Sequence, residues 1–398
     1  MVEEKPFAEI PYSEYRLRNE RVRELMKRHK IDGLILFCRE NHVYYAGWRD
    51  TWDHNFLVAV VLSREGETVL VGPGHIHFGV LSYTYVDRIK RWEELNPKND
   101  PVRSVIEVVE ELGLKNKRLG LELGVGMYPW KATPSEIARL RENLPKASFV
   151  DASEMIWEQR MVKTQWEINL YRKLGKILAE GFRLGLQTAK EGVTERDVQR
   201  VMWNYYISQG LEDTIMQGGV IIRSHPFGVY TPAYTGRAVD RKLAPGDQLM
   251  LDGGPTLKGY HTDIQRQAVI GEPSALQKKL HKLATVGYEA GVEVIKPGTK
   301  GKDLWRIPLE AQRKEDTTYC PSWRFTGHCI GLRIHEPPSW IAEEERELTP
   351  GMVLTLEVAG YDIPEWKVMG AFPEDMFLVT ENGHEVLSDG LSRELWVG

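Results

Sequence analysis

Two glutamates stand beside or within strongly apolar stretches of the carboxyl-terminal half of the chain. Glu357 lies inside residues 354–358, and Glu374 opens residues 374–379. Short apolar runs of this kind predict buried strands. A buried carboxylate without a positive partner is costly because its charge loses its hydration. These strands must therefore either expose both acids at their ends or bring them to a positively charged group.

Two aspartates frame a Gly-rich turn further upstream. Asp252 closes an expected strand over 248–252, and Asp263 lies early in an expected strand over 260–270. A hairpin of these strands can bring the two carboxylates side by side, where one would keep its proton unless a cation lies between them. Aspartate is also common in turns because it caps the backbone. The pair alone is consistent with either interpretation.

His328 lies among small and apolar residues within 326–338. A lone histidine in such a context is more often a core side chain than a ligand. Together with the four acids it has a different meaning, because two divalent cations would bring the set to formal neutrality. Carboxylates and one imidazole suit Mn²⁺, Fe²⁺, Co²⁺ or Zn²⁺, whereas the absence of thiolates argues against a structural zinc. Cys329 is interpreted as a packing residue.

Composition narrows the class of protein. The 398 residues include 52 Lys+Arg and 57 Asp+Glu, a net charge of -5, which argues against a nucleic-acid partner. No run approaches about 18 uncharged apolar residues, so no membrane span is expected. The first residues carry no signal-peptide pattern, and a cytoplasmic protein is expected. Cys38, Cys320 and Cys329 are far apart and form no CxxC pair, which excludes a disulfide framework.

Periodicity predicts two domains, 1–155 and 156–398. In the first, expected strands alternate with expected helices, which indicates a three-layer α/β domain. The strands are 33–38, 56–62, 68–71 and 119–123, and the helices are 15–29, 102–112 and 133–144. The second is predicted to be α+β, with helices over much of 153–186 and over 194–210, 274–295 and 301–314, and strands at 220–222, 248–252, 260–270 and 353–358.

The order of the site residues resembles a known family. An Asp is followed eleven residues later by a second Asp, then by Gly-His-x-x-Gly-Leu-x-x-His-Glu-x-Pro at 327–338, then by two spaced glutamates. This order resembles the creatinase/aminopeptidase P/prolidase family, whose catalytic domain has the pita-bread fold. The resemblance covers 160–398. It is weaker in the first half, where prolidases and creatinase carry a comparable α/β domain.

The resemblance implies a role for each ligand. Asp252 would bind one divalent ion, His328 and Glu357 the other, and Asp263 and Glu374 would bridge both. Water activated by the ions would be the nucleophile, and Glu357 would shuttle the proton.

His335 matches the second histidine of the family, which contacts the substrate; a surface histidine that anchors a turn is the alternative.

Two positions depart from the peptidase members of the family. Thr235 stands where they carry a histidine, and Phe372 stands where prolidase-like members carry an arginine.

The resemblance implies a hydrolase of small peptide-like substrates of the Xaa-Pro type. The departures keep an alternative open, a lyase or C–N hydrolase of the same fold that acts on a small polar or cationic metabolite. A third alternative, a silent binding protein, is disfavoured because all four acids are present.

Aromatic and basic residues are candidates for holding the substrate. Trp48 and Trp52 lie in an aromatic segment, 44–54, that is expected to be an exposed loop. With Tyr234 they could cage a cation, and Arg237 and Arg333 could grip a carboxylate. Packing at an interface is the alternative for the aromatic residues. In two-domain relatives this loop approaches the active site of the other subunit, so a homodimer is expected.

Overall fold

The computed structural model describes residues 5–49, 56–76, 78–93, 96, 98–124, 132–212, 221–226, 238–317, 324–360 and 373–398. The chain divides into two units, Met1–Arg160 and Met161–Gly398. The boundary between them lies five residues after the one expected at residue 155. Each unit is described by itself. Within the described ranges, no helix combines the length and the apolar character that crossing a membrane requires.

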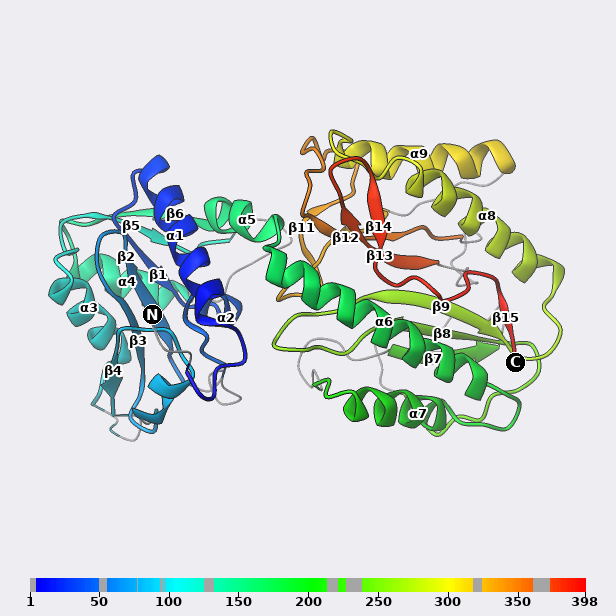
Figure 1. The fold of residues 1–398 in the computed structure, drawn as a ribbon, viewed down its shortest axis with the longest axis horizontal. Coiled ribbons are helices and arrows are strands. Elements are labelled where there is room, and N and C mark those ends of the chain that lie inside the picture. Colours follow the sequence, from blue (N-terminus) through cyan, green and yellow to red (C-terminus); the bar gives the residue numbers. More distant parts are fainter. Residues whose placement is uncertain are drawn as a thin grey trace. The chain divides into compact units, whose positions relative to one another are not determined.

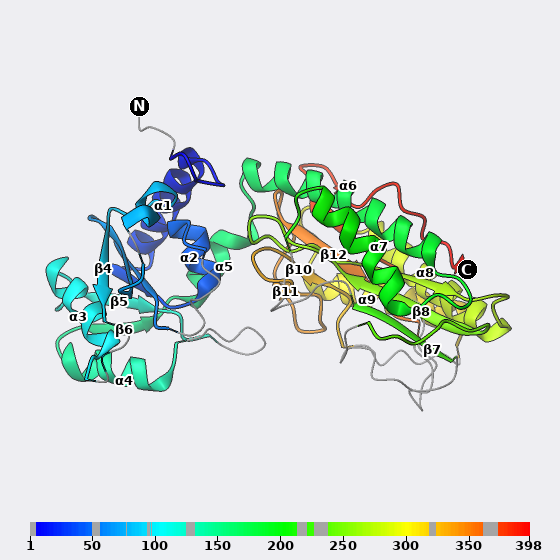
Figure 2. The ribbon, with the colours of Figure 1, turned by 90° about the horizontal axis from the view of Figure 1, so that it is seen from below.

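The first unit contains a six-stranded mixed sheet in the order β4-β3-β2-β1-β5-β6. Its strands are β1 (Gly33–Leu36), β2 (Ala59–Ser63), β3 (Thr68–Pro73), β4 (Arg88–Trp92), β5 (Arg118–Leu121) and β6 (Ser148–Asp151). Its helices are α1 (Tyr12–Arg28), α2 (Arg39–Ala46), α3 (Pro101–Glu111), α4 (Pro134–Asn143) and α5 (Ser153–Met161), with a short 3-10 turn η2 (Phe78–Ser82). Helices α1 and α2 lie on one face of the sheet, and α3 and α4 lie on the other (Figure 2). This confirms the three-layer prediction.

The expected loop over 44–54 is wrong at its start. Tyr44, Tyr45 and Ala46 close helix α2, which ends where Gly47 adopts a left-handed φ of 72°. Nearly all of α2 is buried, so it lacks the polar stripe by which an amphipathic helix is recognised.

The second unit is built on a larger sheet. Its central order is β11-β10-β12-β13-β9-β8-β7, with β14 paired to β13 and β15 paired to β9. The strands are β7 (Ile221–Pro226), β8 (Asp247–Gly253), β9 (Ile264–Val269), β10 (His328–Cys329), β11 (Glu336–Ser339), β12 (Val353–Glu357), β13 (Glu374–Val379), β14 (His384–Val386) and β15 (Trp396–Val397). The helices are α6 (Gln165–Thr188), α7 (Glu195–Ser208), α8 (Ala275–Val292) and α9 (Gly301–Glu315), and Figure 1 shows them beside this sheet.

The helices α6 and α8 identify one face of this sheet as its packed face. Gly185 of α6 lies against Leu251 of β8, and a methyl group at Gly291 of α8 would come within 2.8 Å of Leu356 Cδ2 of β12. Successive residues of a strand point to opposite faces. Asp252 and Glu357, the next residue on each strand, therefore point to the other face.

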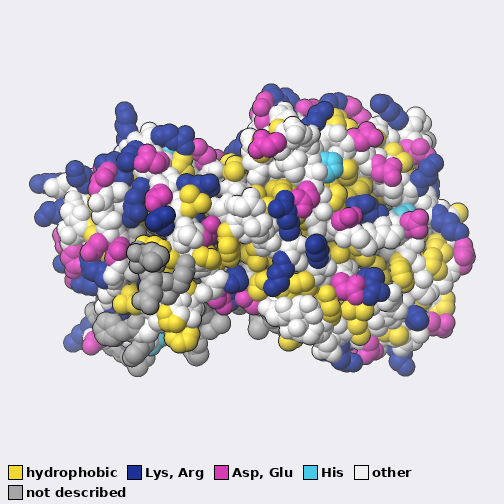
Figure 3. All heavy atoms as spheres, in the orientation of Figure 1, with side chains coloured by type: hydrophobic (Ala, Val, Ile, Leu, Met, Phe, Trp, Pro, Cys, Tyr) yellow, Lys and Arg dark blue, Asp and Glu magenta, His cyan; other side chains and the backbone are white. Residues whose placement is uncertain are grey.

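The side chains at the surface carry both signs of charge. On the face drawn in Figure 3, basic and acidic groups are interspersed and neither sign dominates.

Candidate metal centre

Four strands of the second unit place one residue each in a row across the sheet. Glu357 of β12 is directly opposite Glu374 of β13, Glu374 is opposite Gln265 of β9, and Gln265 is opposite Asp252 of β8. Directly opposite residues share a face of the sheet, so all four side chains point away from α6 and α8. Asp263 precedes Gln265 by two positions and shares that face. Strand pairing thus gathers all four acids that the sequence singled out.

His328 joins the acids from β10. Its Nε2 lies 3.5 Å from Asp263 Oδ2 and 3.7 Å from Glu357 Oε1. Its Nδ1 lies 2.9 Å from the carbonyl oxygen of Cys329. A carbonyl only accepts hydrogen bonds, so Nδ1 carries the proton and the lone pair of Nε2 faces the carboxylates. This is the tautomer that a metal ligand requires.

The donor atoms form overlapping groups of three. One group is His328, Glu357 and Glu374, and another is Asp252, Asp263 and Glu374; within each group the possible ligand atoms lie within 4.8 Å of one another. Glu374 belongs to both groups. Among the described residues, His328 Nε2 and Glu374 Oε1 are buried acceptors without a hydrogen-bond partner. The arrangement fits two divalent ions that share Glu374, with Asp263, whose Oδ2 lies 3.5 Å from His328 Nε2, as a second shared carboxylate.

Burial makes these acids weak in the absence of a cation. Burial and the neighbouring Asp263 raise the pKa of Asp252 to about 8, and burial raises the pKa of Asp263 to about 7. Burial and the other acids raise the pKa values of Glu357 and Glu374 well above their ordinary range. Burial lowers the pKa of His328 to about 4, so its ring is neutral at pH 7. Cations would replace the protons that the carboxyl groups otherwise hold.

His335 lies at the exposed edge of the cluster. Its ring centroid is 4.2 Å from that of His328, with the rings nearly perpendicular, and it forms a third group of possible ligands with Asp263 and His328. Arg333, two residues earlier, is partly buried, and its backbone N–H donates to Glu336.

Of the other expected substrate residues, one is buried and three lie outside the described residues. Trp48 belongs to the first unit, is 2% exposed and stacks on Tyr83 with ring centroids 6.2 Å apart. Its expected exposure on a loop is therefore wrong, because the indole packs inside the unit. Trp52, Tyr234 and Arg237 lie outside the described residues, as do the departures Thr235 and Phe372.

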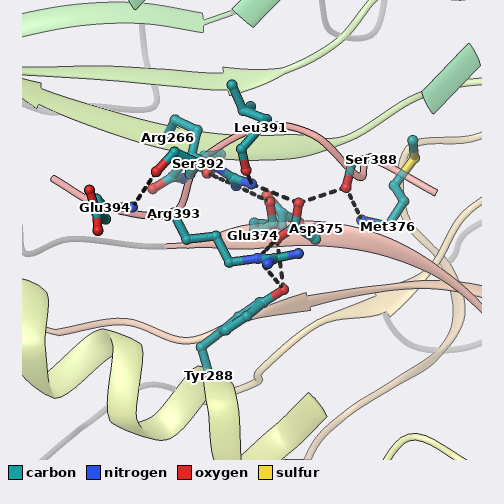
Figure 4. Close-up of polar contacts among 11 residues, drawn as sticks. Arg266, Tyr288, Glu374, Asp375, Met376, Ser388, Leu391, Ser392, Arg393 and Glu394 are labelled. Carbon is teal, nitrogen blue, oxygen red and sulfur yellow. Dashed lines mark hydrogen bonds and ion pairs between the residues drawn. The ribbon is translucent and has the colours of Figure 1, made fainter. Parts of the chain in front are cut away.

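Sequence reasoning missed a polar network on the opposite face of the sheet (Figure 4). Asp375, fully buried, accepts from Arg266 Nη2 at 2.7 Å, Arg393 Nε at 2.7 Å, the Tyr288 hydroxyl at 2.7 Å and the Ser388 hydroxyl at 2.6 Å. The only signal in the sequence was the strand alternation, which sends residues 266 and 375 away from the metal face.

The network holds the two strands that carry the shared ligands. Arg266 Nη1 also donates to the backbone carbonyl of Glu374 at 2.6 Å, which ties β9 to β13. Burial by itself would raise the pKa of Asp375, but the guanidinium groups of Arg266 and Arg393 hold it below its ordinary value. Asp375 is therefore ionised at neutral pH and holds the guanidinium groups of both arginines in position.

Comparison with known proteins finds family matches to both units and similar relatives along most of the chain. Residues 169–381 match metallopeptidase family M24, and residues 18–162 match the creatinase/prolidase N-terminal domain. The uncharacterized peptidase YqhT of Bacillus subtilis is 28% identical over 381 residues, 94% of this chain and 98% of that protein. The Xaa-Pro dipeptidase of Pyrococcus furiosus is 30% identical over 297 residues, 73% of this chain and 77% of the relative.

Solved structures show the same fold. An Xaa-Pro dipeptidase from Bacillus anthracis superposes with a TM-score of 0.79 at 26% identity and covers 96% of this chain and 100% of that one. The family match covers more than half of the chain and coincides with the unit in which the acids and His328 converge. The chain therefore belongs to metallopeptidase family M24, with an amino-terminal domain of the creatinase/prolidase type.

Proposed function

We propose that this chain is a dinuclear-metal hydrolase of short peptides and that Xaa-Pro dipeptides are its substrate class. The observation that carries the proposal is the pair of ligand groups that share Glu374. The relatives support it, since Xaa-Pro dipeptidases are among them.

Each side chain has a role in the proposed reaction. Asp252 and Asp263 would hold one ion and His328 and Glu357 the other, with Asp263 and Glu374 shared. Divalent ions held there would supply Lewis acidity to a water molecule and to the scissile carbonyl. The bond from His328 Nδ1 to Cys329 keeps its ring oriented for ligation. Glu357 would receive a proton and return it to the leaving amine.

His335, at the exposed edge beside His328, would contact the substrate as bond breaking proceeds. Trp48, Trp52, Tyr234, Arg237 and Arg333 remain predicted substrate residues.

The metals can be tested directly. Elemental analysis of the purified protein should find about two divalent ions per chain, and a chelator should abolish turnover. Manganese, iron, cobalt and zinc should then be restored one at a time to identify the ion that supports activity. A chain that turns over fully without divalent ions would end the proposal.

A second candidate function follows from Thr235 and Phe372, which stand where the peptidase pattern has a histidine and an arginine. It is a lyase or C–N hydrolase of a small polar or cationic metabolite. Loss of one charged contact costs about 2–5 kcal/mol, or about 30-fold to several thousand-fold in rate. A kcat/KM for Xaa-Pro dipeptides above about 10⁴ M⁻¹s⁻¹ supports the peptidase. Much slower dipeptide turnover beside rapid turnover of a betaine, sulfonium or guanidino compound supports the second candidate.

We also propose a cytoplasmic homodimer. The proposal rests on the aromatic segment that contains Trp52, since apolar side chains on loops commonly mark interfaces. Light scattering at micromolar concentration should give twice the 45.7 kDa mass of the chain. A fully active monomer would refute the dimer and leave the metal chemistry unaffected.

A further inference from the structure

Gln265 occupies the one position in the ligand row that carries no ionisable group. It lies on β9 between Asp252 on one side and Glu374 on the other, directly opposite both. Asp263, which directly precedes β9, is two residues away on the same face. The side chain of Gln265 is 1% exposed. A neutral amide is thus enclosed by three of the four proposed carboxylate ligands.

The two ends of this amide have different partners. The side chain of Gln265 hydrogen-bonds the carboxylate of Asp252. This hydrogen bond acts to lower the pKa of Asp252, as a donor to a carboxylate does, so the amide nitrogen is the end that faces Asp252. The Oε1 atom is buried and has no hydrogen-bond partner among the described residues. Leaving a buried oxygen unpaired is unfavourable, because it loses its hydrogen bonds to water and gains none in return.

The surroundings limit what can satisfy this oxygen. Once cations have replaced their protons, the neighbouring carboxylates of the row offer no donor to this oxygen. A divalent cation is the partner that the donor set supplies, and amide oxygens are suitable ligands for such ions. Four carboxylates already balance two divalent charges, so a further ligand at this position has no need of a charge of its own.

We propose that Gln265 is a neutral member of the metal centre. Its amide nitrogen holds Asp252 in its ligating orientation, and its oxygen faces the ion held by Asp252, Asp263 and Glu374. This inference rests on the dinuclear site proposed above. It predicts that Gln265 acts on that ion and leaves the ion at His328 and Glu357 unaffected.

Three variants test the proposal. Gln265→Leu removes both ends of the amide at similar volume, and Gln265→Glu keeps an oxygen ligand. Gln267→Leu is the matched control, because Gln267 is also buried on β9, two residues along the same face, but it accepts from Gln248 at 2.7 Å. Calorimetric titration of the metal-free protein with Mn²⁺ measures each ion. Visible absorption with Co²⁺ reports the ligand set, and thermal melts compare the metal-free and loaded proteins.

Gln265→Leu should weaken one of the two ions about 10- to 100-fold, as loss of an orienting partner typically does, and should alter the Co²⁺ spectrum. In its metal-free form, removal of the unpaired oxygen and loss of the bond to Asp252 act in opposite directions, so its melting temperature should change less than that of the loaded protein. Gln265→Glu should still bind two ions. Gln267→Leu should lower stability equally with and without metal and leave both affinities unchanged.

The proposal is overturned if Gln265→Leu binds both ions as the wild type does. It is also overturned if Gln265→Glu is as weak as Gln265→Leu, since the oxygen would then be irrelevant. If the wild type itself binds no ions, the dinuclear site fails, which is a different result from either of these.

Discussion

Replacing Asp375 by asparagine would remove one charge from the network behind the metal centre at almost constant volume (Figure 4). The carboxylate accepts from two hydroxyl groups and two guanidinium groups, with Arg266 and Ser388 on Oδ1 and Arg393 and Tyr288 on Oδ2. Asparagine offers one accepting oxygen and one NH₂ group that only donates. The hydroxyl groups can rotate to accept, whereas a guanidinium cannot. One arginine must therefore face a donor.

The loss of stability caused by Asp375→Asn depends on which arginine side chain can reach solvent. The side chain of Arg266 is 3% exposed and cannot reach water, whereas that of Arg393 is 35% exposed and can turn partly outward. Removing one partner of a buried ion pair costs about 3–5 kcal/mol. Because Arg393 has a route to solvent, we expect about 3 kcal/mol, at the low end of this range.

The assay is urea unfolding of the metal-free protein at pH 7, where the lowered pKa of Asp375 keeps it ionised. The control is Asp303→Asn, which breaks an i,i+3 pair with Arg306 whose side chains are 32% and 48% exposed, and which should cost about 0–1 kcal/mol. Adding Arg393→Met to Asp375→Asn should recover part of the loss, because the guanidinium facing the amide is gone.

The reasoning fails if Asp375→Asn is no more destabilising than Asp303→Asn. It fails also if the double variant loses the full sum of the two single changes, since the residues would then be uncoupled.

Three further outcomes are expected. Asp263→Ala should lose both ions and His328→Ala should mainly weaken one, as elemental analysis can show, because only the former belongs to the shared ligands. Chelation should lower the melting temperature more at pH 8 than at pH 6. The pKa values of Asp252 and Asp263 are raised to about 8 and about 7, so their protonated forms stabilise the metal-free fold at low pH. This stabilisation is lost as pH rises. Equal shifts at both pH values would contradict this. In the first unit, burial raises the pKa of Glu122 to about 7. The protonated side chain therefore contributes about 3 kcal/mol to the free energy of unfolding below about pH 4.5, and this contribution is lost as pH rises through 7. Glu122→Gln should flatten the dependence of urea-unfolding stability on pH over this interval.

Local chemistry allowed the sequence to determine several elements. The capping box at Thr133 and Glu136 predicts a helix start that the structure places at α4, and Thr194 with Asp197 does the same for α7. A cap depends only on residues three apart, so the sequence contains all of its partners. The acids were conspicuous for a similar reason, since charge within an apolar run needs explanation whatever the fold. Helix α2 was missed because it is buried on nearly all sides and shows no amphipathic period.

Only the tertiary structure decided the rest. The facing of Glu357 and Glu374, the insertion of Gln265 between Glu374 and Asp252, and the contact of Asp375 with Arg266 all depend on strand pairing between distant segments. A register shift of one residue would send every side chain of a strand to the other face. The sequence therefore determined which residues had to meet a cation. Pairing, which depends on the packing of the whole unit, decided which of them share a face and which neutral residue lies among them.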